Sequence, residues 1–141
     1  MTSQETEKGA AASGSDPALL AERSFPATTE GLAGAQAFLE EYQESPKPAI
    51  IIDEIVSNIV RCSGATGFTI RFFAEGEQLF RMEFIDDGRA FDPTREIAEP
   101  DVTAGVEDRQ IGGLGMFMVK KMSKSVAYVR DGSCNRLTVV L

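Results

Sequence analysis

Histidine and tryptophan are absent from this sequence, and cysteine occurs only twice. Without histidine there is no imidazole to complete a common zinc site and no histidine that could carry a phosphoryl group. Cys62 and Cys134 lie far apart and lack CxxC spacing, so we interpret both as reduced thiols. Acid-base chemistry must therefore come from carboxylates, lysine, tyrosine or thiol.

Long apolar runs are also missing. No stretch reaches the roughly 18 residues that a membrane helix needs, and residues 1–10 are polar. We therefore expect neither a membrane helix nor a secretory signal, and a cytoplasmic location. Basic residues are few and the formal net charge is −8, so a direct contact with nucleic-acid phosphates is not expected.

The composition is that of one globular domain. The chain has 141 residues, of which 43% are hydrophobic and 26% charged. Residues 1–22 consist mainly of small and polar types, whose burial cannot offset the entropy lost on ordering, and we predict a disordered tail there. We predict that residues 23–141 form a single domain.

The periodicity predicts alternating short strands and helices. A short strand is expected at 23–27, followed by a helix at 30–42 that Thr28 or Thr29 caps. Residues 50–62 are apolar nearly all round and could be called a strand, but their length after a proline favours a buried helix. Strands are then expected at 68–73 and 79–85, followed by a long lid-like loop at 86–110. Residues 111–115 open a third helix that ends at about residue 122. The chain closes with a hairpin of strands at 126–130 and 136–140.

Glu54 and Asn58 lie four residues apart on the helix expected at 50–62, which places both on one face, roughly 6 Å from each other. Such a pair can be a satisfied polar pair or part of a solvated stripe. The surrounding Ile and Val residues favour burial, and a buried carboxylate is costly without a metal, a partner or a chemical role. An asparagine carbonyl oxygen suits magnesium, with nucleotide phosphates and water completing the octahedron.

Glycines open the helix expected near residue 113. Gly112, Gly113 and Gly115 leave the backbone N–H groups accessible, which is typical of phosphate binding. The pattern is not a P-loop, and Met118 stands where a dinucleotide fingerprint requires glycine. A glycine-rich loop without a ligand remains the alternative.

Asp86, Asp87 and Gly88 follow the end of the strand expected at 79–85. They can form an ordinary turn or a solvated carboxylate pair. A functional carboxylate there can accept a hydrogen bond from an adenine amino group, while Gly88 lets the base pack against backbone. The order along the chain favours the second interpretation, because a helix with ExxxN precedes a strand ending in DxG, a long loop and a glycine-rich helix start.

These motifs and their order resemble the GHKL ATPase superfamily, with DEIVSN as the N box, DDGRAFDP as the first glycine box and IGGLGMFMVKKM as the second. The resemblance covers about residues 25–141. Within the superfamily, the chain looks most like the anti-sigma factor serine kinases of bacterial partner-switching systems. The resemblance implies a Bergerat-type fold, an α/β two-layer sandwich with a mixed, mostly antiparallel sheet and three helices on one face.

The resemblance also implies roles for individual residues. Glu54 would be the general base that helps to deprotonate the attacking hydroxyl, and Asn58 would ligate Mg²⁺. Asp86 would hold the amino group of the adenine of ATP, with Gly88 beneath the base. These roles describe in-line transfer of the γ-phosphoryl group to a serine hydroxyl.

Four further residues receive roles in the same way. Gly113 and Gly115 would receive the phosphates, and Arg109 in the lid would contact the terminal phosphate or remain an ordinary solvated charge. Thr138 would support the adenine pocket beside Asp86 or remain a plain strand residue. The sequence departs from the family pattern in two places: an alanine replaces the second glycine of DxGxG, and the histidine often found after the N box is absent.

Two functions are therefore weighed. The first is an ATP-dependent serine-protein kinase and anti-sigma factor that phosphorylates an anti-anti-sigma (STAS-domain) protein and binds a sigma factor, as a homodimer like its relatives. The second is a nucleotide-gated module that sequesters a sigma factor or another regulator without efficient phosphoryl transfer. A histidine-kinase fragment is a third reading, but no phosphoacceptor histidine precedes the domain.

Overall fold

The computed structural model describes residues 18–96 and 113–141. Within them lie three α-helices, five strands and two short helical turns. In chain order these are β2 (Ala18–Pro26), α1 (Thr29–Glu40), α2 (Pro46–Asn58), the π-helical turn η1 (Ile59–Ser63), β3 (Gly67–Glu75), β4 (Gln78–Asp86), the 3₁₀ turn η2 (Pro93–Glu96), α3 (Gly113–Met122), β5 (Ser125–Asp131) and β6 (Cys134–Val140).

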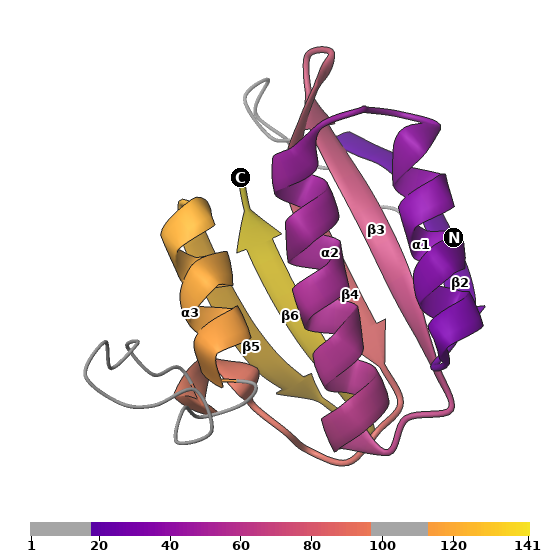
Figure 1. The fold of residues 1–141 in the computed structure, drawn as a ribbon, viewed down its shortest axis with the longest axis vertical. Coiled ribbons are helices and arrows are strands. Elements are labelled where there is room, and N and C mark those ends of the chain that lie inside the picture. The colour runs from indigo at the N-terminus through magenta and orange to yellow at the C-terminus, as the bar shows by residue number, and fades with distance from the viewer. Residues whose placement is uncertain (1–17, 97–112) are drawn as a thin grey trace, which may run out of the picture.

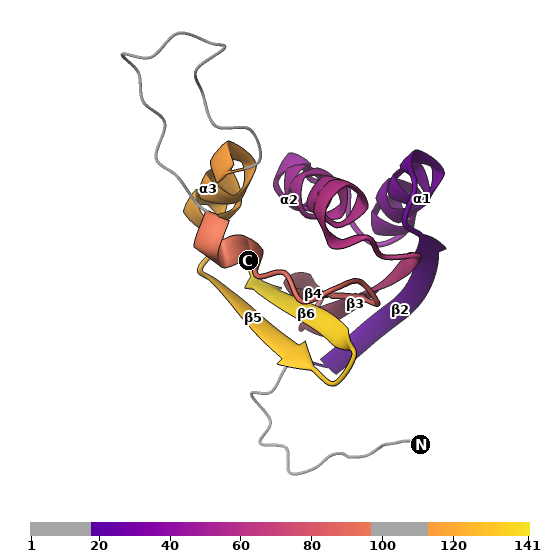
Figure 2. The ribbon, with the colours of Figure 1, turned by 90° about the horizontal axis from the view of Figure 1, so that it is seen from below.

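The strands form one open sheet in the order β2-β3-β4-β6-β5. Figures 1 and 2 show α1, α2 and α3 side by side on one face of this sheet, with the opposite face uncovered by helices. This arrangement confirms the predicted two-layer α/β sandwich. Every neighbouring strand pair in the described residues is antiparallel, so the parallel pair that a mixed sheet requires is not seen there.

The hydrophobic core fills the space between the helices and the sheet. On β3, alternation turns Phe68, Ile70 and Phe72 toward the helices and leaves the residues between them on the outer face. The ring of Phe72 stacks on that of Phe38 from α1 at a centroid separation of 4.5 Å. Helix α2 supplies the largest helical share of the buried residues: Ile51, Ile52, Ile55 and Val56.

The starts of two elements differ most from the sequence prediction. Strand β2 begins at Ala18, within the segment predicted to be a disordered tail, because residues 18–26 pair with residues 67–74 of β3. Helix α2 begins at Pro46, where proline fits the first helical turn, and not at Ile50. The start of β2 depends on pairing across strands and has no local signal, whereas the proline that opens α2 is a local signal for a helix start.

Helix α2 does not end as a regular α-helix. It continues into the π-helical turn η1, which stops at Gly64 in the left-handed conformation with φ of 69°. The extra residue of a π-turn shifts the following side chains, and such turns are frequent at functional sites. No helix within the described ranges is long and apolar enough to cross a membrane.

A substitution at the N-cap of α1 would test how much capping contributes to the stability of the fold. Thr28 is the N-cap, and its hydroxyl oxygen accepts a hydrogen bond of 3.1 Å from the backbone N–H of Gly31. Replacing this acceptor in Thr28→Val should lower the free energy of unfolding by about 1 kcal/mol. Thr28→Ser keeps the hydroxyl and should retain most of the stability. Urea unfolding of the two variants measures the difference, and equal losses would contradict the capping role.

Candidate functional site

Asp86 stands at the end of β4, on the face of the sheet that the helices cover. Its side chain is only 6% exposed, and Oδ1 accepts hydrogen bonds of 2.9 Å from the backbone N–H of Gly88 and from Nδ2 of Asn135. Both hydrogen bonds fall on one oxygen. Asp86 can therefore offer Oδ2 to a hydrogen-bond donor of a ligand.

Gly88 packs tightly against Ser63, the last residue of η1. A Cβ atom on Gly88 would stand 2.5 Å from the carbonyl oxygen of Ser63 and 2.6 Å from its hydroxyl oxygen. The next residue, Arg89, donates its backbone N–H to the same Ser63 carbonyl at 2.9 Å. The structure thus gives the glycine a packing role within the chain, and its contact with a base stays a prediction.

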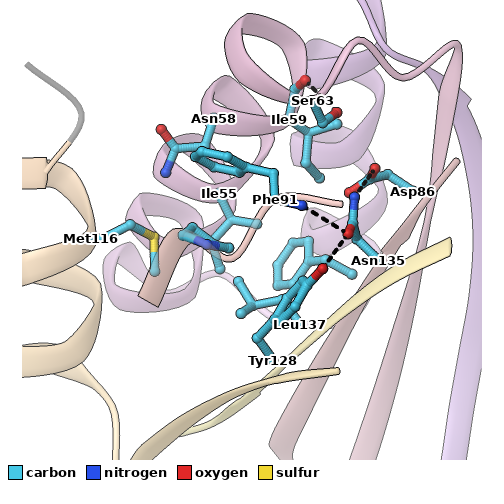
Figure 3. Close-up of a pocket in the computed structure, with 12 residues that line it drawn as sticks. Ile55, Asn58, Ile59, Ser63, Asp86, Phe91, Met116, Tyr128, Asn135 and Leu137 are labelled. Carbon is cyan, nitrogen blue, oxygen red and sulfur yellow. Dashed lines mark hydrogen bonds between the residues drawn. The ribbon is translucent and has the colours of Figure 1, made fainter. Parts of the chain in front are cut away.

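Asn58, at the end of α2, is 7% exposed and lies in the wall of the same cavity as Asp86. Figure 3 shows its amide beside the ring of Phe91 and near Met116 of α3. Its Oδ1 accepts a hydrogen bond of 2.8 Å from Nη2 of Arg61. The oxygen predicted to bind a metal is therefore already turned toward a cationic group.

Glu54 lies on α2 one turn before Asn58, and its carboxylate contacts the start of α3. A Cβ atom on Gly115 would collide with Oε1 of Glu54 and would stand 3.1 Å from Cδ. Gly113 is the first residue of that helix. The positive end of the α3 dipole lies at this turn, so a carboxylate is favourable here. The structure thus brings the N box and the second glycine box into direct contact.

The cavity between these elements is small. Its walls include residues of α2, η1, the turn after β4, α3, β5 and β6, and its volume is about 20 Å³. A space of this size has room for about one water molecule. Side chains that line it must move before a nucleotide base can enter.

Of the predicted site residues that the structure describes, Asn58 and Asp86 line this cavity, whereas Glu54, Gly88, Gly115 and Thr138 are not among its lining residues. Arg109 lies outside the described residues. Thr138 is on β6 opposite Glu83, on the uncovered face of the sheet, three residues from the position that pairs with Asp86. The predicted place of Thr138 beside Asp86 is therefore corrected, because strand alternation turns it away from the helices.

Asn135 occupies the position that sequence reasoning assigned to Thr138. It pairs with Asp86 in the β4–β6 register and is 4% exposed. The signal was present, because Asn135 shares the parity of the apolar residues Leu137 and Val139 and so belongs to the buried face. A buried amide on a strand needs hydrogen-bond partners, which here include the carboxylate of Asp86.

Asp87 faces the other way from Asp86 and has a different task. It is exposed, and its carboxylate accepts hydrogen bonds from the hydroxyl of Thr66, from the backbone N–H of Thr66 at 2.8 Å and from that of Gly67 at 3.2 Å. These hydrogen bonds, the one from the Thr66 hydroxyl first, lower the pKa of Asp87 below its ordinary value. The paired aspartates therefore divide into one in the cavity wall and one that clamps the start of β3.

The comparison with protein families identifies the fold. Residues 25–141 match the histidine kinase-like ATPase domain. The chain belongs to this family, which confirms the resemblance to GHKL ATPases.

A relative in Bordetella bronchiseptica, named serine/threonine-protein kinase BtrW, is 28% identical over 90 residues. The match covers 62% of this chain and 63% of the relative, so the chain spans less than two thirds of that protein. Together with the family match it supports a kinase-like ATPase domain, and an ATPase domain implies ATP binding.

The Asp87 clamp predicts a dependence of stability on pH. Because the folded-state pKa is below the ordinary value of 3.8, the clamp stabilises the fold at higher pH and is lost as pH falls through the folded-state pKa. Asp87→Ala should lose roughly 1 kcal/mol at pH 7, a modest amount because the group is exposed. Denaturant unfolding should show this difference shrinking below about pH 4. Asp53→Ala, at an exposed helix position, is the control, and a pH-independent difference for Asp87→Ala would contradict the clamp.

The contact between Glu54 and Gly115 predicts coupling between the two positions. Gly115→Ala alone should change stability little or lower it by at most about 1 kcal/mol, because the new methyl group displaces only the flexible end of the Glu54 side chain and the gain in helix propensity offsets part of that cost. In the background of Glu54→Ala, the same substitution should be neutral or stabilising by up to about 1 kcal/mol, since only helix propensity remains. A double-mutant cycle on thermal unfolding measures the coupling. Additive effects would contradict the contact.

Proposed function

We propose that this chain is an ATP-dependent serine-protein kinase and anti-sigma factor, which phosphorylates an anti-anti-sigma (STAS-domain) protein in bacterial partner switching. The observation that carries the proposal is the contact of Glu54 with Gly115, which sets a carboxylate against the first turn of a glycine-opened helix. The Bordetella relative is named a serine/threonine-protein kinase, which supports phosphoryl transfer to a hydroxyl amino acid.

In this proposal the nucleotide lies between α2, the turn after β4 and the start of α3. Asp86 accepts a hydrogen bond from the adenine amino group through Oδ2, and Gly88 lies beneath the base. The backbone N–H groups at Gly113 and Gly115 receive the phosphates, because the N-terminus of a helix favours anions. Arg109, outside the described residues, remains proposed for the terminal phosphate.

Asn58 fits the role of a magnesium ligand. Its Oδ1 is a neutral, hard carbonyl oxygen, the kind of donor that Mg²⁺ binds, and the ion would take the place of the Arg61 guanidinium that donates to this oxygen at 2.8 Å. A single protein oxygen matches the preference of Mg²⁺ for completing its octahedron with phosphates and water. When bound, the ion would neutralise charge on the phosphates.

Glu54 performs the proton transfer in the proposed reaction. Its carboxylate accepts the proton of the attacking serine hydroxyl as the bond between serine Oγ and the γ-phosphorus forms. The bond from the γ-phosphorus to the bridging oxygen breaks, and that oxygen leaves with ADP. The products are phosphoserine and ADP, and positioning supplies most of the catalysis.

Two features favour the second candidate, a nucleotide-gated module that sequesters a regulator without efficient phosphoryl transfer. Arg61 holds the Asn58 oxygen that the kinase proposal gives to Mg²⁺, so the ion must displace this hydrogen bond before it can bind. The family's histidine after the N box is also absent. Both features are expected to slow phosphoryl transfer while leaving ATP binding intact.

The partners belong to the same proposal. The anti-anti-sigma protein is the substrate, the sigma factor is the sequestered ligand, and the active form is a cytoplasmic homodimer. The net charge of −8 favours protein partners over nucleic acid.

The kinase proposal predicts a separation of binding from transfer. The wild-type chain should transfer label from ATP to a serine of a candidate anti-anti-sigma protein in the presence of Mg²⁺. Glu54→Gln should slow transfer by about 100-fold or more while ATP affinity changes little, because it removes only the base. Asp86→Asn should instead weaken ATP binding. Single-turnover transfer and calorimetric titration measure the two quantities.

A partner protein with alanine at the labelled serine is the control for the site of transfer. Tight Mg²⁺-dependent ATP binding without label on any candidate partner would favour the nucleotide-gated module. The absence of ATP binding by the wild-type chain would overturn both candidates. Unchanged transfer by Glu54→Gln would remove Glu54 from the mechanism.

A further inference from the structure

Asn135 is a buried amide whose two polar atoms are both engaged. Its Nδ2 donates to Oδ1 of Asp86 at 2.9 Å and to the carbonyl oxygen of Arg89 at 2.8 Å. Its Oδ1 accepts from the backbone N–H of Phe91 at 3.3 Å and from the hydroxyl of Tyr128 at 2.5 Å. Nδ2 faces two hydrogen-bond acceptors and Oδ1 faces hydrogen-bond donors. Only one orientation of the amide therefore satisfies every partner.

These hydrogen bonds join two different parts of the site. One Nδ2 bond reaches the carboxylate of Asp86, and the other reaches the turn of residues 88–91 that follows it. Arg130 of β5 ties the same turn to the hairpin, since its Nη1 donates to the carbonyl of Gly88 at 2.8 Å and to Oδ1 of Asn135 at 3.1 Å. Figure 3 shows Asn135 between Asp86 and Tyr128. The turn and the carboxylate are thus held by one side chain.

The orientation of the Asp86 carboxylate depends on this network. The backbone N–H of Gly88 and the amide of Asn135 both bind Oδ1, so rotation of the carboxylate would break two hydrogen bonds in a buried site. Without Asn135, only the bond from Gly88 would remain of these two. Gly88 itself would also be held less firmly, because Asn135 anchors the next residue, Arg89.

We propose that Asn135 is a positioning residue that determines base selectivity, by holding Asp86 with Oδ2 available to an exocyclic amino group. The ligand class is a nucleoside triphosphate whose base carries such a donor. This inference rests on the proposed nucleotide site and deepens it. Asn135 acts through Asp86 and the turn of residues 88–91 and makes no contact with the base.

The test compares two nucleotides that differ by one amino group. The wild-type chain should bind Mg-ATP at least about tenfold more tightly than Mg-purine riboside triphosphate, which lacks the 6-amino group. Asn135→Leu keeps the approximate size of the side chain but removes both donors. It should lower affinity for ATP by about tenfold and leave affinity for the analogue nearly unchanged, so the ratio of the two approaches one. Isothermal titration calorimetry measures both affinities.

Thr138→Val is the matched control, because it removes a hydroxyl from the same strand on the opposite face of the sheet. It should keep the wild-type ratio. A purely structural role for Asn135 predicts a lower melting temperature with equal losses for both nucleotides. A folded Asn135→Leu variant that keeps the wild-type ratio would overturn the inference. Failure of the wild-type chain to bind either nucleotide would instead overturn the proposed function.

Asn135→Ser is the second variant if the leucine variant does not fold, since serine keeps a polar group in the buried site but is too short to replace the amide. The same loss of ratio is expected, and a retained ratio counts against the inference. A measurement on the wild-type chain is independent of both variants. ATP should shift the side-chain amide resonances of Asn135 in NMR spectra more than the analogue does. Equal shifts would overturn the inference.

Discussion

Asp86 is a carboxylate in the interior, where burial opposes a charged group unless hydrogen bonds compensate for lost water. Two hydrogen bonds to Oδ1 provide that compensation, one from Gly88 and one from Asn135. The second exists only because β4 and β6 pair with Asp86 opposite Asn135. A slip of one residue in this register would turn Asn135 to the uncovered face and leave Asp86 short of a partner. The site therefore depends on the register of this strand pair.

The same packing that builds the core also assembles the side chains of the candidate site. Helix α2 buries one face against the sheet and carries Glu54 and Asn58 along its border with α3. The π-helical turn that follows α2 places Ser63 where it meets the backbone of Gly88. Three segments far apart in sequence thus meet because apolar burial fixes α2 and α3 on one sheet face. The packing of α2 and α3 on the sheet is sufficient to hold the N box against the second glycine box.

Much of this fold could be predicted from local patterns. The capping threonine, the alternation of β3 and the Asp-Gly turn between β5 and β6 each follow from short-range physics, and the structure has them. The start of β2 could not be predicted, because residues 18–22 become a strand only by pairing with β3. The role of Asp87 could not be predicted either, since only the turn after β4 sends its carboxylate to Thr66 while Asp86 faces the cavity.

The sequence by itself determined the kinds of element, their order and the family, because hydrophobic periodicity and motif order are properties of the chain alone. It also determined that Glu54 and Asn58 share a helix face. Tertiary structure decided that Glu54 rests against Gly115, that Asn135 and not Thr138 stands beside Asp86, and that Gly88 packs on Ser63. These contacts depend on strand register and on the approach of packed helices, which are set by residues distant in sequence and so leave no local pattern to read.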